Sequence, residues 1–93
     1  MVVGILQIEL FVPESGSLKS KRFVLRSLKD RLKNKFNVSV AEVDGGDKWQ
    51  RSTLGIAAVS NDAKFLESVL RKALDLVYGD HHVQVIDSTM EFL

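Results

Sequence analysis

The sequence contains no cysteine and only one proline, Pro13, among its 93 residues. Without cysteine the chain can form neither a disulfide nor a thiolate zinc site, and a reducing compartment is its natural setting. The single proline and the mixed composition leave no linker or low-complexity tract. No apolar stretch approaches the roughly 20 residues of a membrane span, and the first residues lack the positive charge of a secretory signal. We therefore expect a cytoplasmic protein without a membrane partner.

Length and composition predict one domain over residues 1–93. Hydrophobic residues make up 45% of the chain and charged residues 27%, which are the proportions of a folded globular protein. A domain this small buries a modest share of its surface, so pairing with a second copy along a sheet edge would add stability. A homodimer is therefore one expectation.

The hydrophobic pattern alternates between the two-residue repeat of strands and the three-to-four-residue repeat of helices. A polar loop over residues 14–17 leads into the first helix, with Ser17 as its N-cap. Gly79 follows the second helix, where a left-handed residue would end it. The pattern predicts strands over 2–12, 38–44, 52–60 and 82–92, and helices over 18–36 and from about 61 to 78. This β-α-β-β-α-β order predicts a ferredoxin-like α+β fold, a four-stranded antiparallel sheet with two helices on one face.

Two helices on one face leave the other face of the sheet open. An RNA-recognition motif of the same topology reads bases with aromatic residues on its two central strands. Here residues 52–60 contain no aromatic, and Glu9 on the first strand would repel phosphate. Strand alternation predicts a mixed, somewhat acidic open face made of Ile5, Gln7, Glu9, Phe11, Val85, Asp87, Thr89 and Glu91.

A net charge of +1 conceals a strong segregation of charge along the chain. Residues 19–35 hold eight basic residues and one acidic residue, a charge of +7, whereas the rest of the chain carries −6. Arg22, Arg26, Lys29 and Lys33 are spaced by four, three and four residues, which aligns them along the helix as one basic ridge. Such a row is either a solvated helix face or a surface for a polyanion. Ordinary solvated faces mix the two signs, which favours the polyanion.

Phe23 projects away from the apolar stripe of the same helix, between Lys19 and Arg26. It is either an exposed aromatic that can stack on a base or a side chain packed under a loop or a second subunit. The predicted nucleic-acid-binding residues, on helix one and on the loop that follows residue 44, are Lys19, Lys21, Arg22, Phe23, Arg26, Lys29, Lys33, Lys48, Trp49 and Arg51.

The hairpin end around Trp49 has more than one interpretation. Its carboxylates could form a hard-cation or catalytic site. However, we expect Glu42 and Asp44 to share one strand face and Asp47 to lie beyond two glycines, so the three carboxylates do not converge on one point. In a structural interpretation Trp49 buries its ring against the sheet or a partner subunit, and Arg51 pairs with Asp44 or Glu42. A binding surface is the third possibility.

Catalytic and metal chemistry have little support in the sequence. His81 and His82 are adjacent, so in a strand they point to opposite faces and do not chelate one ion. Neither Ser15 nor Ser17 has a visible nucleophile-activating partner. We predict no enzyme activity, catalytic residue, metal site or cofactor.

Two segments carry a family resemblance: residues 17–22 with Leu25, and residues 37–44 with 47–50. Together they resemble the YlxP-like family of small bacterial proteins, over nearly the whole chain. The resemblance implies a ferredoxin-like domain, genes beside those of translation initiation and ribosome maturation, and hence a ribosome-linked role. Phe23 departs from the polar residue expected there, so a stacking role would be peculiar to this chain.

The sequence thus predicts a non-catalytic protein that binds RNA or a ribosomal particle through the first helix. The alternative is a dimeric scaffold, or a small-ligand-binding regulator, that uses the open sheet face and an acidic protein partner.

Overall fold

The structure, a computed structural model, describes residues 1–13 and 16–93, so residues 14 and 15 of the predicted loop lie outside the described residues. The predicted order of elements is confirmed, with boundaries that differ by a few residues. The elements are β1 (Val2–Phe11), α1 (Leu18–Lys35), β2 (Ser39–Asp44), β3 (Arg51–Ser60), α2 (Ala63–Tyr78) and β4 (Gln84–Phe92).

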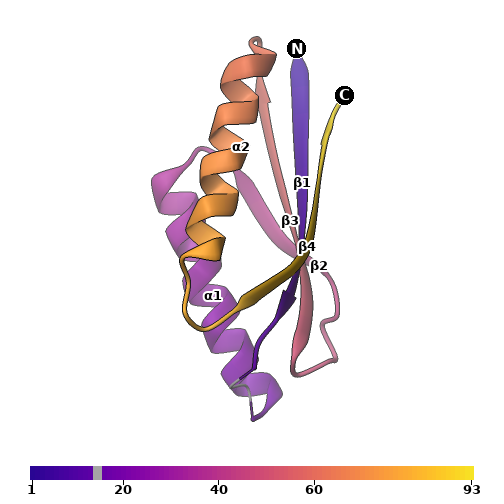
Figure 1. Ribbon diagram of the computed structural model, residues 1–93, viewed down its shortest axis with the longest axis vertical. Helices are drawn as coiled ribbons and strands as arrows, with labels where there is room; N and C mark the ends of the chain where they lie inside the picture. Colours follow the sequence, from indigo (N-terminus) through magenta and orange to yellow (C-terminus); the bar gives the residue numbers. More distant parts are fainter. Residues whose placement is uncertain (14–15) are drawn as a thin grey trace.

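The four strands form one antiparallel sheet in the order β2-β3-β1-β4, and both helices cover the same face (Figure 1). This is the predicted ferredoxin-like arrangement. α1 lies over β2, and α2 lies over β1, β3 and β4. The core between the layers includes Leu6, Ile8 and Leu10 of β1 and Leu28 and Leu32 of α1, all 0% exposed. Among the described residues, neither helix has the length and hydrophobicity needed to span a membrane.

The register of β4 corrects one expectation about the open face. Glu9 pairs with Asp87, but Leu10 pairs with Val85, so Ile86 is an extra residue in a β-bulge. The bulge reverses the facing of the residues before it. Val85 therefore lies on the helix side, packed against the core, and its predicted place on the open face is wrong.

A second bulge lies in β2. Glu42 pairs with Leu54 and Asp44 with Thr53, which leaves Val43 as the extra residue. Leu54 is buried under the helices, so Glu42 points toward the helix layer and Asp44 toward the open face. The expectation that these two carboxylates share a face is wrong, and this further separates the acidic groups of the hairpin.

The helix ends can be compared with the capping residues predicted from the sequence. Ser17 is the N-cap of α1, and its hydroxyl accepts a hydrogen bond from the Ser20 amide at 3.1 Å, as predicted. Asp62 caps α2 by accepting from the amides of Lys64 and Phe65. Gly79 has φ −79°, a right-handed conformation, so the predicted left-handed residue at this position is wrong.

The fold separates charge between its two layers. α1 carries +7 and α2 carries +1, whereas the four strands hold five acidic residues and one basic residue, a charge of −4. Because the helices form one layer and the strands the other, the outer helical surface is basic and the sheet is acidic. An anionic macromolecule is therefore attracted to the helical side.

The turn after β2 gives a stability test. Gly45 has φ +83°, and a Cβ there would lie 2.9 Å from the Arg51 carbonyl oxygen. We expect Gly45→Ala to lower the free energy of unfolding by about 2 kcal/mol, because it adds both strain and a clash. Gly46→Ala is the matched control, since its Cβ would come no closer than 3.8 Å to Glu42 Oε1. Urea denaturation measures the free energy of unfolding of both variants. Equal losses of stability would contradict the strain and the clash expected at Gly45.

Candidate nucleic-acid interface

The basic ridge of α1 is a surface feature. Arg22, Arg26 and Lys33 are exposed and Lys29 is half-buried. Leu25, Leu28 and Leu32 face the core from the same helix, so the helical period that buries the leucines turns the ridge toward solvent. At about 1.5 Å per residue, the ridge is about 16 Å long.

No carboxylate of the described residues lies within ion-pair distance of the four ridge side chains. The ion pairs found in residues 1–13 and 16–93 are made by Lys21, Arg31, Arg51, Arg71 and His82. Like charges at helical spacings of three and four repel by a few tenths of a kcal/mol per pair. A bound polyanion would relieve this repulsion.

Phe23 lies on the solvent side of the same helix and is 73% exposed. Of its two interpretations, packing under a loop of the same chain is excluded by this exposure. Lys19, at the first turn, is exposed too. Stacking of Phe23 on a base stays a prediction, and its position beside the ridge is compatible with it.

Lys21 is the main correction to the predicted site. Its side chain is 0% exposed, so it is not available to an external phosphate. Its ammonium donates to the carbonyl oxygens of Gly45 at 2.6 Å and Arg51 at 3.1 Å, and also to that of Lys48. It also lies 3.2 Å from Glu42 Oε2. Lys21 therefore binds the chain itself and not a ligand.

The Lys21 contacts fasten the β2–β3 loop to the first turns of α1. Ser52 completes the network, because its hydroxyl donates to Glu42 Oε2 at 2.6 Å. An ammonium has three donors and its charge needs a counterion, and this cage supplies both. The loop residues Lys48 and Trp49 are held next to α1 as a result.

The hairpin end differs from its structural interpretation in two ways. Trp49 is 57% exposed, so the expectation that its ring is buried is wrong within this chain. Arg51 pairs with Glu9 at 3.8 Å, and not with Asp44 or Glu42. Since Ser52 is buried on the helix side, Arg51 points to the open face, away from α1, and its role in nucleic-acid binding stays a prediction. Lys48 is exposed and stays a candidate.

Metal-binding constellations are not found in the described part of the chain: no three His, Cys, Asp or Glu side chains are grouped to hold an ion. His81 and His82 precede β4 in a turn, and both are exposed. His82 Nδ1 lies 3.3 Å from Asp80 Oδ1. The pair thus belongs to the α2–β4 connection.

Two buried charges were missed from the sequence. Lys21 is four residues before Leu25 and seven before Leu28, inside the apolar stripe, a position where a charge must find partners. This position in the apolar stripe is a sequence signal that Lys21 is buried. Asp80, 7% exposed, accepts from Arg31 at 2.8 Å across 49 residues of chain, and no local pattern indicates that contact.

Comparison with known proteins shows the family of this chain. The family model described as "Protein of unknown function (DUF503)" matches residues 3–90. The chain belongs to the DUF503 family. A relative named "Uncharacterized protein YlxP", from Bacillus subtilis (strain 168), is 41% identical over 76 residues, covering 82% of this chain and 83% of the relative. The resemblance to YlxP-like proteins is confirmed.

A solved structure shares the fold of this DUF503 protein. It is a REP-associated tyrosine transposase bound to a REP hairpin, with a TM-score of 0.52 and 12% identity. The alignment covers 98% of the DUF503 chain and 55% of the transposase, so the DUF503 chain spans about half of that protein. At this identity the comparison shows a common fold alone.

The Lys21 cage predicts a large stability effect. We expect Lys21→Met to lower the free energy of unfolding by about 3 kcal/mol, because the half-buried Glu42 loses its counterion and the loop carbonyls lose the ammonium donor. Urea denaturation of Lys19→Met, an exposed lysine of the same helix, is the control and should change little. Equal stability of the two variants would show that the cage contributes nothing.

Proposed function

We propose that this DUF503 protein is a non-catalytic RNA-binding protein that acts on ribosomal particles in translation or ribosome maturation. One observation carries the proposal: four basic side chains stand in a row on the outer face of α1, without carboxylate partners among the described residues. Lysine and arginine side chains in such a row neutralise successive phosphates. The resemblance to YlxP-like proteins, with its ribosome-linked gene context, favours RNA among the polyanions.

The distribution of charge supports contact through the helices and not through the sheet. The open face carries Glu9 and Asp87 as direct cross-strand neighbours, which repels phosphate. Arg51, the one basic residue of the strands, is already paired with Glu9. Phosphate and shape recognition by the helical layer is therefore favoured over base readout on the sheet.

The exposed aromatics extend the proposed surface. Phe23 lies on the outer face of α1 near its N-terminal end, and Trp49 lies on the loop that Lys21 fastens to the same end. Each exposed ring offers a stacking partner for an unpaired base. Lys19 and Lys48 add positive charge at this end of the helix.

The fold is compatible with nucleic-acid binding. The transposase of similar fold is itself bound to a REP hairpin. The comparison adds that a domain of this topology can serve a nucleic-acid-binding protein, and it says nothing about which residues would do so here.

Salt dependence is the sharpest test of the ridge. If it neutralises about four phosphates of duplex RNA, log affinity should fall against log salt with a slope of about −3.6. Replacing Arg26 and Lys33 by glutamine should reduce the slope to about −1.8, since glutamine keeps the helix and removes the charge. Fluorescence anisotropy with a ribosomal RNA fragment at several salt concentrations measures the slope.

The matched control is the double substitution Lys64→Gln with Lys72→Gln. Both residues are exposed on α2, and the change in net charge is the same. We expect its slope to stay close to that of the unaltered protein. An equal reduction in both double variants would show that net charge, and not the ridge, determines binding, and a salt-insensitive affinity would refute the proposal.

A second candidate function uses the open face. Val43 lies over Gly55, where an added Cβ would come within 2.9 Å of Val43 Cγ1, and a shallow apolar hollow of about 320 Å³ lies beside them. This hollow favours the alternative of a dimeric scaffold or small-ligand-binding regulator. Sedimentation equilibrium of the protein and of Val43→Lys distinguishes the two candidates. If the protein is a dimer that Val43→Lys dissociates without changing the RNA affinity, then the open face pairs two copies and the ridge binds RNA independently of it. If the protein is a monomer, the dimeric scaffold is refuted.

A further inference from the structure

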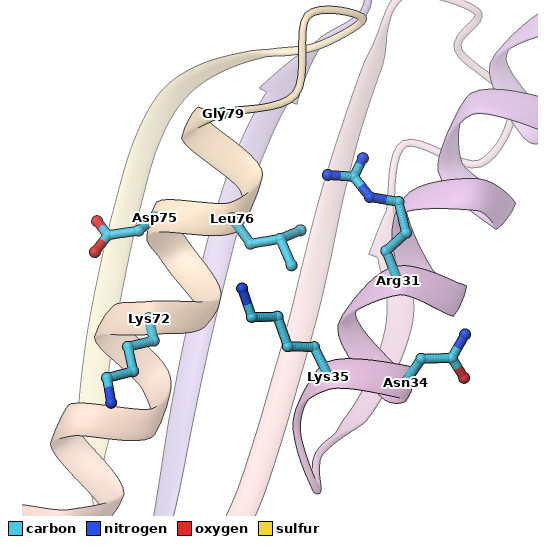
Figure 2. Close-up of a pocket in the computed structure, with 7 residues that line it drawn as sticks. All are labelled: Arg31, Asn34, Lys35, Lys72, Asp75, Leu76 and Gly79. Atoms are coloured by element: carbon cyan, nitrogen blue, oxygen red, sulfur yellow. The ribbon is translucent and has the colours of Figure 1, made fainter.

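A groove runs between the C-terminal halves of α1 and α2, on the helical layer (Figure 2). Its volume is about 830 Å³, and it is lined by residues of both helices and by Gly79 just beyond α2. Small-ligand sites commonly have volumes of about 300–1,000 Å³. The groove therefore has room for a ligand the size of a nucleotide.

The side chains that enter the groove are two cations and one apolar group. Arg31 and Lys35 reach from α1 toward α2, and Leu76 points from α2 into the space between them (Figure 2). Asp75, the acidic residue of the lining, points away from this space. The interior is thus positive on one side and apolar on the other, a combination that suits an anion attached to an apolar group.

Arg31 is held in position by a buried carboxylate. Its Nη1 donates to Asp80 Oδ2 at 2.8 Å, and the side chain of Asp80 is 5% exposed. Asp80 is fixed in turn, because Oδ1 accepts the His82 amide at 2.8 Å. A guanidinium has five N–H donors, so donors stay available for a ligand while the side chain is already ordered.

Lys35 is the second cation of the groove. Its Nζ lies 5.9 Å from the centre of the Phe36 ring, a cation–π distance. No carboxylate of the described residues pairs with it. Arg31 and Lys35 are four residues apart, so they lie on one face of α1 and can meet the same phosphate group.

We propose that the groove binds a phosphate monoester of nucleotide size, with the phosphate between Arg31 and Lys35 and the base or sugar against Leu76. A monoester carries about −1.5 to −2 charges at neutral pH and three acceptor oxygens, which suit the unpaired Lys35 ammonium and the Arg31 N–H groups that Asp80 does not occupy. The site is separate from the ridge, because Lys35 is about 160° around the helix axis from Lys33 at about 100° per residue. It does not depend on the RNA-binding proposal.

NMR titration of the full chain tests the site with three probes: adenosine 5′-monophosphate, adenosine and inorganic phosphate. We expect saturable shifts of the Leu76 methyl and Arg31 side-chain N–H signals with the monophosphate, weaker Arg31 shifts with phosphate, and none with adenosine. Lys35→Gln should weaken binding of the monophosphate about tenfold, equivalent to about 1.4 kcal/mol. Lys64→Gln, the same charge change at an exposed position of α2 outside both the groove and the ridge, should leave it unchanged.

The absence of saturable Leu76 shifts, or equal weakening in Lys64→Gln and Lys35→Gln, would overturn the proposal. Short RNAs with and without a 5′-phosphate, used as competitors, separate the two sources of this chemistry. Competition by the phosphorylated RNA alone assigns the site to an RNA end, and competition by neither assigns it to a free nucleotide. Equal competition by both would refute recognition of a monoester. Because the ridge variants are measured separately, failure here and failure of RNA binding are distinguishable.

Discussion

The buried ammonium of Lys21 is the interaction on which the arrangement of the candidate interface depends. The β2–β3 loop turns the carbonyl oxygens of Gly45 and Lys48 toward the first turns of α1, where they accept from a donor in addition to the Lys48 amide that already bonds to Gly45. A lysine inside the apolar stripe supplies that donor, and Glu42 neutralises its charge. Regular strand alternation from Val40 brings Glu42 to this side of the sheet, and the bulge at Val43 then turns Asp44 to the other side. One residue thereby fixes how α1, with its ridge, is joined to the loop that carries Trp49.

The separation of charge between the layers gives this small domain an electrostatic direction. The two helices carry a charge of +8 and the four strands a charge of −4, so the electrostatic field turns the helical layer toward an approaching polyanion. Domains of the same topology that read RNA on the sheet need aromatics and little negative charge there. Here Glu9 and Asp87 occupy that surface as neighbours, whereas the exposed Phe23 and Trp49 lie outside it. The proposed contact surface follows from where the charges lie and not from the topology.

Periodicity was sufficient to predict the elements and their order, because the sheet is buried on one face and the helices on one stripe. It failed where one residue alters the register: each bulge reverses side chains locally, and no signal in the sequence marked the bulges near Val85 or after Glu42. Lys21 was misassigned because charge was counted before its position in the apolar stripe was considered. The contact between Arg31 and Asp80 is a tertiary pairing that a single sequence does not reveal. The exposure of the ridge follows from the helical period, whereas the pairing of Arg31 with Asp80 does not.

If this protein binds RNA as proposed, the RNA contacts its helical layer. Ultraviolet cross-linking in a lysate of its own cells, followed by mass spectrometry of the nucleotide-modified peptides, tests this most directly. We predict adducts on peptides of α1 and of the β2–β3 loop, with Phe23 and Trp49 the expected positions, and their loss after ribonuclease treatment before irradiation. Adducts confined to β1 and β3, or no adduct on a protein recovered in good yield, would contradict the account.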